Sequence, residues 1–179
     1  MRKLTMSELN RKSVEGFKSA DKAPITVILD NVRSMHNVGS VFRTADAFLI
    51  EHIILCGYTP KPPHRDIQKT ALGATETVHW TYQENTIAAL SELQSKGYTI
   101  IAVEQAEGSQ MLQNFTISPN QKIALIFGNE VDGVSDEALE LCSQCIEIPQ
   151  SGSKHSLNIS VAAGIVLWEC YKSIMANNA

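Results

Sequence analysis

Residues 24–29 read PITVIL, a short run of apolar and mostly β-branched side chains with the length and composition of a buried strand. Apolar side chains then recur at helical spacing from Val38 to Phe48, which predicts a helix over residues 37–49. A second apolar run at residues 53–55 predicts another buried strand. Strand, helix and strand in this order predict two parallel strands joined by a helical crossover.

The same alternation continues along the chain. Proline-rich residues 57–66 are predicted to form a loop, and residues 104–120 are predicted to be irregular. The remaining predicted elements are strands at 78–82, 99–103, 123–127 and 145–148 and helices at 86–96 and 135–141. The sequence therefore predicts an α/β fold, a mostly parallel sheet flanked by helices on both faces.

The composition favours a single soluble domain. A chain of 179 residues with 44% hydrophobic residues can bury a core without disulfides or metals. Residues 1–23 are polar and charged, so we expect an N-terminal basic arm or short helix before a domain at residues 24–179. No signal peptide is recognisable, and no uninterrupted apolar run approaches the ~20 residues of a membrane span. These features predict a cytoplasmic protein with no membrane partner.

Charge is distributed unevenly. The net charge is −4 overall, but residues 1–69 carry +4 and residues 70–179 carry −8. A polyanionic partner would therefore meet the first part of the chain. Its basic residues include Arg2, Lys3, Arg11, Lys12, Arg33, Arg43, Lys61, Arg65 and Lys69.

Cys142 and Cys145 form a C-x-x-C pair, which is typical of a redox site or of half a zinc site. A zinc site needs a second pair of ligands, and no Cys or His pair at ligand spacing occurs elsewhere. We therefore expect no metal and two reduced, half-buried thiols, one ending a helix and the other beginning a strand.

The composition of residues 158–175 predicts a C-terminal helix with apolar side chains on nearly all of its faces. A terminal helix usually keeps one polar face toward water. Burial of the extra apolar surface in a homodimer interface is the favoured interpretation, and burial within one chain is the alternative.

Three segments at predicted strand ends combine small, polar and chargeable residues, at residues 31–43, 127–133 and 148–158. Ligands of α/β proteins bind at this edge of the sheet. Each segment also has a structural explanation, because Asn37 can be a helix N-cap, Gly128 and Asn129 can form a turn, and the two-residue spacing of Ser156 and Asn158 can be chance. Asn37 and Arg43 are six residues apart, a rotation of roughly 240° on a helix, so they can share a site only if Asn37 precedes the helix.

Taken together, the segments resemble the SpoU/TrmH family of RNA ribose 2′-O-methyltransferases, over residues from about 24 to 175. The matching motifs are NVRSMHNVGSVFR at 31–43, IFGNEVDGV at 126–134 and IPQSGSKHSLNISVAAG at 148–164, with KTALGA at 69–74 similar to a central segment of the family. A hydrolase built on His155 and Ser156 is the other possibility, but the chain lacks a G-x-S-x-G elbow.

The resemblance implies a SPOUT-type fold with a C-terminal trefoil knot, a homodimer and S-adenosyl-L-methionine as cofactor. In this sequence, the positions that match the family's cofactor-binding residues are Gly128, Ile148 and Leu157. The G-x-G-x-x-G of ordinary dinucleotide sites does not follow the first strand, which fits a differently built pocket.

Five catalytic positions are implied by the resemblance, namely Asn37, Arg43, Glu130, Ser156 and Asn158. Transfer of a sulfonium methyl to a ribose 2′-oxygen requires alignment and removal of the hydroxyl proton. Arg43 is the family's candidate for activating the hydroxyl, but a guanidinium with a pKa above ~12 is a poor base and is better suited to clamping a phosphate. We expect Ser156 and Asn158 to position Arg43 or the nucleotide, and Asn37 and Glu130 to order the pocket.

The expected substrate is transfer or ribosomal RNA, with transfer RNA slightly favoured because compact relatives often act there. Substrate-binding candidates are the basic residues Arg11, Lys12, Arg33, Lys61 and Arg65. Two other functions stay open, a base methyltransferase of the same knotted superfamily and a catalytically silent RNA-binding module.

Overall fold

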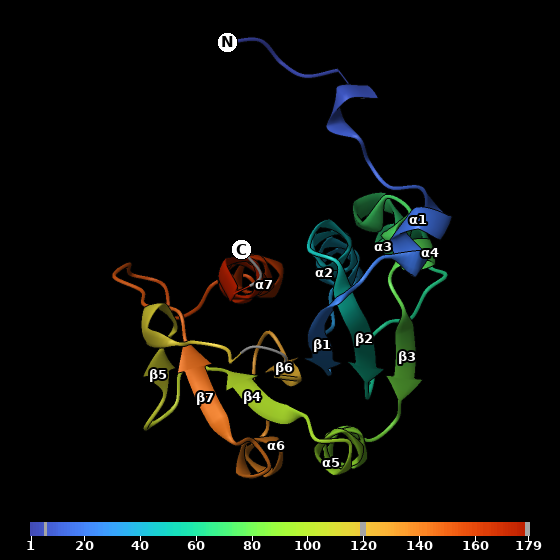
Figure 1. The fold of residues 1–179 in the computed structure, drawn as a ribbon. Helices are drawn as coiled ribbons and strands as arrows, with labels where there is room; N and C mark the ends of the chain where they lie inside the picture. The colour runs from blue at the N-terminus through green and yellow to red at the C-terminus, as the bar shows by residue number, and fades with distance from the viewer. Residues whose placement is uncertain (6, 119–120, 178–179) are drawn as a thin grey trace.

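The computed structural model describes residues 1–5, 7–118 and 121–177, which form one seven-stranded sheet flanked by helices (Figure 1). Every pair of neighbouring strands is parallel, so the predicted α/β architecture is confirmed. The trefoil knot implied by the resemblance stays a prediction. In sheet order the strands are β3 (Trp80–Gln83), β2 (Ile50–Cys56), β1 (Ala23–Asp30), β6 (Ile123–Phe127), β4 (Thr99–Val103), β7 (Gln144–Glu147) and β5 (Gln110–Met111).

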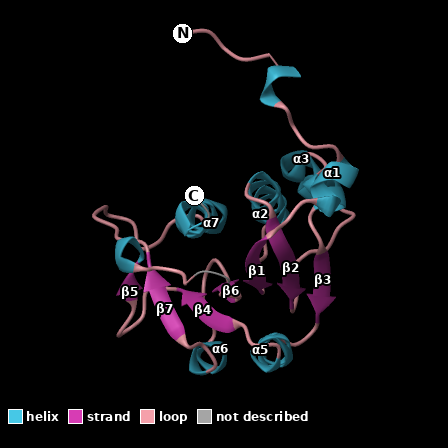
Figure 2. Cartoon of the chain, viewed as in Figure 1, coloured by secondary structure: helices cyan, strands magenta, loops and turns pink. Residues whose placement is uncertain are grey.

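Helices cover both faces of the sheet (Figure 2). One face carries α1 (Val14–Ser19), α2 (Met35–Ala47), α3 (Arg65–Ala71), α4 (Ala74–Thr77) and α7 (Ile159–Asn177), and the other carries α5 (Thr86–Ser95) and α6 (Asp136–Glu140). Successive side chains of a strand point to opposite faces, so Val27 and Leu29 enter the first core while Ile28 enters the second. A sheet buried on both faces explains the continuous apolar run that marked β1 in the sequence.

The start of α2 differs from the sequence expectation. Ser34, not Asn37, is the N-cap, and its hydroxyl oxygen accepts a hydrogen bond from the Asn37 backbone N–H at 3.2 Å. The interpretation of Asn37 as an N-cap is therefore wrong, and Asn37 lies inside the first turn. Asn37 and Arg43 then lie on the same helix and point in different directions.

Two other segments depart from expectation. Residues 104–120, expected to be irregular, contain the edge strand β5 and the 3₁₀ turn η2 (Leu112–Asn114). β5 has only two residues, too few for an alternating pattern to be visible in sequence. The strand expected at 78–82 begins instead at Trp80, because Val78 closes the short helix α4.

Helix α7 packs beside α2 and buries Ala163, Val166 and Leu167 in the first core. By length and composition alone it is apolar enough to cross a membrane. Because these side chains fill the core of an α/β sheet, we interpret α7 as a core helix with one uncovered apolar face.

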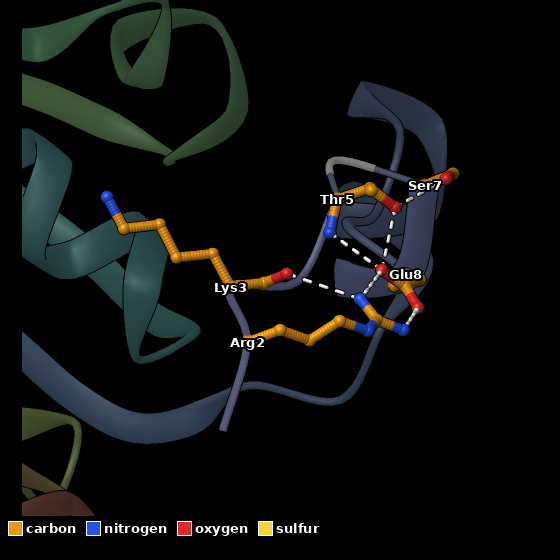
Figure 3. Close-up of polar contacts among 5 residues, drawn as sticks. All are labelled: Arg2, Lys3, Thr5, Ser7 and Glu8. Carbon is orange, nitrogen blue, oxygen red and sulfur yellow. Dashed lines mark hydrogen bonds and ion pairs between the residues drawn. The ribbon is translucent and has the colours of Figure 1, made fainter.

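The N-terminal segment extends away from the sheet before α1 returns to it (Figure 1). A cluster around the 3₁₀ turn η1 (Ser7–Leu9) orders its first residues (Figure 3). There Arg2 Nη1 donates to Glu8 at 2.9 Å, and the Thr5 backbone N–H donates to the same carboxylate at 2.7 Å. Phe17 of α1 is buried in the first core and fixes the segment to the body of the domain.

Candidate cofactor and catalytic site

A cavity of about 420 Å³ opens at the carboxyl ends of β4, β6 and β7. In parallel sheets the loops that follow neighbouring strands meet at this edge and form the ligand crevice. The three sequence-predicted cofactor positions and three of the predicted catalytic residues line the cavity, namely Gly128, Ile148, Leu157, Glu130, Ser156 and Asn158. The fold thus brings the second and third motifs together.

The loop after β6 is closed on itself. Asn129 and Gly133 exchange backbone hydrogen bonds of 3.0 Å in both directions. A Cβ added at Gly128 would lie 2.0 Å from the carbonyl carbon of Gly133, so no side chain fits there. Gly133 itself has a φ of 72°, which favours glycine. These two glycines allow residues 128–134 to form the tight loop that makes one wall of the cavity.

Asn129 fastens this loop to the neighbouring strands. Its side-chain oxygen accepts from the Val131 backbone N–H at 2.7 Å. Its Nδ2 donates to the Asn31 carbonyl at 2.8 Å and to the Tyr58 hydroxyl oxygen at 2.7 Å. Asn129 is 7% exposed, so both ends of its amide are satisfied inside the protein. Sequence reasoning treated Asn129 only as a turn residue and missed this anchoring.

Glu130 joins the same loop to the start of α2. Its carboxylate accepts from the backbone N–H groups of Arg33 at 2.9 Å and Ser34 at 3.1 Å, and from Asn37 Nδ2 at 3.1 Å. Partial burial raises the pKa of Glu130, but the hydrogen bonds from Arg33 and Ser34 outweigh it, and the pKa lies below its usual value. A negative charge at a helix N-terminus is also favoured by the helix dipole.

The polar network reaches the third motif through Asn37. Asn158 Nδ2 donates to Asn37 Oδ1 at 3.1 Å, while the other end of the Asn37 amide binds Glu130. Asn37, Glu130 and Asn158 are therefore one connected group. Ser156 lies at the exposed rim of the cavity, two residues before Asn158.

Glu104, at the end of β4, is a site residue that sequence reasoning did not identify. It lines the cavity, and its carboxylate accepts from the Val134 backbone N–H at 3.0 Å and from the Gln105 N–H at 2.8 Å. Gln105 in turn donates to the His155 carbonyl at 2.7 Å. The only sequence signal was its position directly after an apolar strand.

Arg43 is not brought to the cavity of its own chain. It is exposed on α2 and does not line the cavity. The side of α2 that carries Asn37 faces Glu130, and a rotation of roughly 240° separates Arg43 from it. One chain thus assembles four of the five sequence-predicted catalytic residues and leaves the arginine outside.

The described residues contain no group of three or more His, Cys, Asp or Glu side chains that could hold a metal ion. Cys142 and Cys145 are free and partly buried, as expected from the sequence. Burial raises the pKa of Cys142 to about 11, which keeps the thiol protonated and unreactive at neutral pH.

Comparisons with known proteins fit this site. Residues 24–168 match the SpoU rRNA Methylase family over most of the chain. The chain belongs to this family. The 23S rRNA (guanosine-2′-O-)-methyltransferase RlmB of Vibrio cholerae serotype O1 is 31% identical over 170 residues, which cover 95% of this chain and 68% of that protein.

Two solved structures of the SpoU family share the fold. The TrmH/SpoU tRNA modifying enzyme of A. aeolicus is 27% identical, with a TM-score of 0.81 over 92% of this chain and 82% of that one. The AdoMet-bound rRNA methyltransferase of Sinorhizobium meliloti is 28% identical, with a TM-score of 0.77 over 89% of this chain and 60% of that one. The family predicted from the motifs is confirmed, and so is its predicted activity, the S-adenosylmethionine-dependent 2′-O-methylation of RNA.

The residues around the cavity suit this cofactor. Its volume lies in the range of small-molecule sites. Leu157 and Val131 are apolar side chains that stay 37% and 73% exposed at its wall, where an adenosyl group could cover them. Glu104 and Glu130 add negative charge beside the cavity, which favours a sulfonium cation.

Proposed function

We propose that this chain methylates a ribose 2′-hydroxyl of a transfer or ribosomal RNA in the cytoplasm, with S-adenosylmethionine held between residues 128–134 and 148–158. The observation that carries the proposal is that these two segments line the same cavity. Bound there, the cofactor supplies an activated methyl group. The chain's own residues then have to align the ribose with that methyl and accept or relay the hydroxyl proton.

Within this proposal, Glu130, Asn37 and Asn158 order the pocket through their hydrogen-bonded chain. Ser156, which lines the cavity and is exposed, is proposed to contact the incoming nucleotide. Gly128, Ile148 and Leu157 hold the adenosyl part of the cofactor through backbone groups and apolar contacts.

A homodimer would complete this site. Along α7 the exposed side chains Val161, Ile165 and Trp168 recur at helical spacing and form one apolar stripe. Exposed aliphatic and aromatic surface of this kind favours a second copy of the chain. Arg43 is exposed on α2, the helix that packs beside α7, so we propose that it acts on the RNA at the partner's cavity.

The dimer is tested by measuring molar mass in solution. Ile165→Glu places a charge in the apolar stripe and is expected to give monomers, whereas the wild type gives dimers. Leu4→Glu, at an exposed apolar residue of the N-terminal segment, is the control and should leave the mass unchanged. A wild-type protein that is monomeric at micromolar concentration would contradict the dimer.

The role of Arg43 is tested by complementation. Arg43→Ala is expected to keep cofactor binding and to lose methyl transfer. Mixing it with a pocket variant such as Glu130→Ala restores one intact site in each heterodimer if the arginine acts across subunits. Unchanged turnover by Arg43→Ala removes this residue from the mechanism, and a mixture with no recovered activity contradicts the shared site.

RNA is proposed to bind along the basic residues of the first part of the chain. Four ion pairs occur among the described residues, and none of them includes the proposed RNA-binding cations Arg11, Lys12, Arg33, Lys61 and Arg65. Arg11 and Lys12 belong to the segment 1–23, which we propose as an arm for RNA. Affinity for RNA should weaken as salt increases, since bound phosphates release counterions.

The reaction itself is tested with labelled S-adenosylmethionine and purified transfer and ribosomal RNA. Nuclease digestion and mass spectrometry should locate the new methyl on a ribose. Methyl on a base would instead indicate the alternative methyltransferase, and no transfer to either RNA would support the silent RNA-binding module. The RNA that accepts the methyl identifies the substrate.

A further inference from the structure

Two exposed tyrosines lie at the carboxyl edge of the sheet, near the ends of β2 and β3. Tyr58 follows β2 and is 57% exposed, and Tyr82 lies on the edge strand β3 and is 37% exposed. Both rings are held by their hydroxyl groups. The Tyr82 hydroxyl donates to the Gly57 carbonyl at 2.9 Å, and the Tyr58 hydroxyl oxygen accepts from Asn129 at 2.7 Å. Fixed rings with uncovered surface are suited to stacking.

A cationic side chain lies over each tyrosine ring. Lys61 Nζ lies 3.8 Å from the centre of the Tyr82 ring, and the Arg33 guanidinium carbon lies 5.9 Å from the centre of the Tyr58 ring. Neither cation takes part in an ion pair with a carboxylate among the described residues. Positive charge is thus gathered on the aromatic surface and is available to an anion.

The two tyrosines and the pocket loop lie in one row. The sheet order β3, β2, β1, β6 places Tyr82 outermost, Tyr58 next and the loop of residues 128–134 at the inner end. Neighbouring strands are ~4.8 Å apart, so about 14 Å separates the ends of β3 and β6. The Tyr58–Asn129 hydrogen bond joins the row directly to the cavity wall.

We propose that Tyr58 and Tyr82, with Arg33 and Lys61, form a stacking platform for unpaired nucleotides that flank the target ribose. The proposal rests on the proposed function and deepens it, because it specifies single-stranded RNA at this surface. Aromatic faces stack on bases of any sequence, while the cations bind the phosphates between them. Lys61, on a flexible stem, can leave the Tyr82 ring for a phosphate when a base arrives. A duplex hides its base faces and cannot use the rings.

Binding of a labelled oligouridine, followed by fluorescence anisotropy, tests the platform at Tyr82. Tyr82→Leu keeps an apolar side chain but removes the ring, and is expected to weaken binding roughly 5- to 150-fold, the usual effect of losing one stacked base. Tyr82→Phe keeps the ring and should restore nearly all of the affinity. Affinity for a blunt RNA duplex of the same length should be the same for Tyr82→Leu and the wild type.

Tyr98 offers a control at the amino-terminal ends of the strands, where its ring is partly buried against the second core. It precedes β4, and Lys122 Nζ lies 5.7 Å from the centre of its ring, so it carries the same pair of groups far from the cavity. Tyr98→Leu should bind oligouridine like the wild type. Circular dichroism of each variant confirms that it is folded.

Failure of the platform and failure of the proposed function give different results. If the wild type methylates RNA and Tyr82→Leu binds oligouridine as tightly as the wild type, the platform is wrong and the function stands. An equal loss for the duplex also overturns the platform. If oligouridine binding depends on the Tyr82 ring but no methyl reaches RNA, the function is wrong and the platform stands. No RNA binding by the wild type overturns both.

Discussion

The link between the pocket loop and α2 passes through the Glu130 carboxylate, and Glu130→Gln is a small change that tests it. The substitution keeps the size of the side chain but removes its charge and one of its two acceptor oxygens. In the wild type the two oxygens accept three hydrogen bonds, from Arg33, Ser34 and Asn37. A glutamine amide has one acceptor oxygen, and its NH₂ group would face these donors.

The magnitude follows from these contacts. A hydrogen bond to a charged group contributes ~1.5–3 kcal/mol, and a charge at a helix N-terminus adds ~0.3–1 kcal/mol. Glu130 is exposed, so the lower ends apply, and the loop loses about 2 kcal/mol of ordering free energy. If the cofactor binds only the ordered loop, this loss weakens its affinity by up to roughly 30-fold, the full factor applying where the ordered form no longer dominates.

Isothermal titration calorimetry with S-adenosylmethionine measures this affinity. Glu137→Gln is the matched control, because Glu137 is also an exposed acid near a helix N-terminus, that of α6, and lies outside the cavity. We expect the control to bind like the wild type. Equal affinities of Glu130→Gln and the wild type would refute the idea that this carboxylate orders the cofactor pocket.

Three further predictions concern the loop, a histidine and a thiol. Gly128→Ala should abolish cofactor binding in calorimetry, because its Cβ would meet the Gly133 and Val134 backbone, whereas Gly152→Ala, with open space around it, should not. Burial, assisted by the neighbouring His79 and Lys96, lowers the pKa of His52 to about 4, so the unfolded chain binds a proton first as pH falls below ~6.5. Wild-type stability at about pH 5 should therefore fall by ~1 kcal/mol after allowing for solvent screening, and His52→Gln should lack this loss in thermal melts. Cys142→Ser should leave methyl transfer unchanged, and a large loss of activity would contradict a purely structural thiol.

Most strands of the sheet could be predicted from the sequence because they are buried on both faces. Residues 25–29 are apolar except for the buried Thr26, and residues 123–127 are apolar throughout, which is the length and composition of strands buried on both faces. The crossover helices α2, α5 and α6 were equally visible through their periodicity or capping, but α3 and α4 between β2 and β3 were not predicted, and α3 begins at Arg65 inside the expected loop 57–66. The two-residue strand β5 was not predicted either, since its exposed Gln110 and Met111 pair only with the edge of β7.

The motifs at the strand ends also predicted which segments meet at the cavity, but not what holds them there. Glu104 and Asn129 act through backbone N–H and carbonyl groups of residues distant in sequence, such as Val134 and Asn31. Backbone groups carry no sequence signature, because every residue except proline has both. Their partners are therefore fixed by the fold and become visible only in three dimensions.

The position of Arg43 shows how strongly a site can depend on where a helix begins. Had α2 begun after Asn37, the Asn37 side chain could have turned toward Arg43 and one chain could have held both in its pocket. Capping by Ser34 instead places Asn37 in the first turn, where its amide bridges Glu130 and Asn158 and holds α2 in one rotational setting. That same setting turns Arg43 outward, on a helix packed beside the uncovered apolar stripe of α7. The hydrogen bonds that order the cofactor pocket of one subunit are thus the ones that would present its arginine to another.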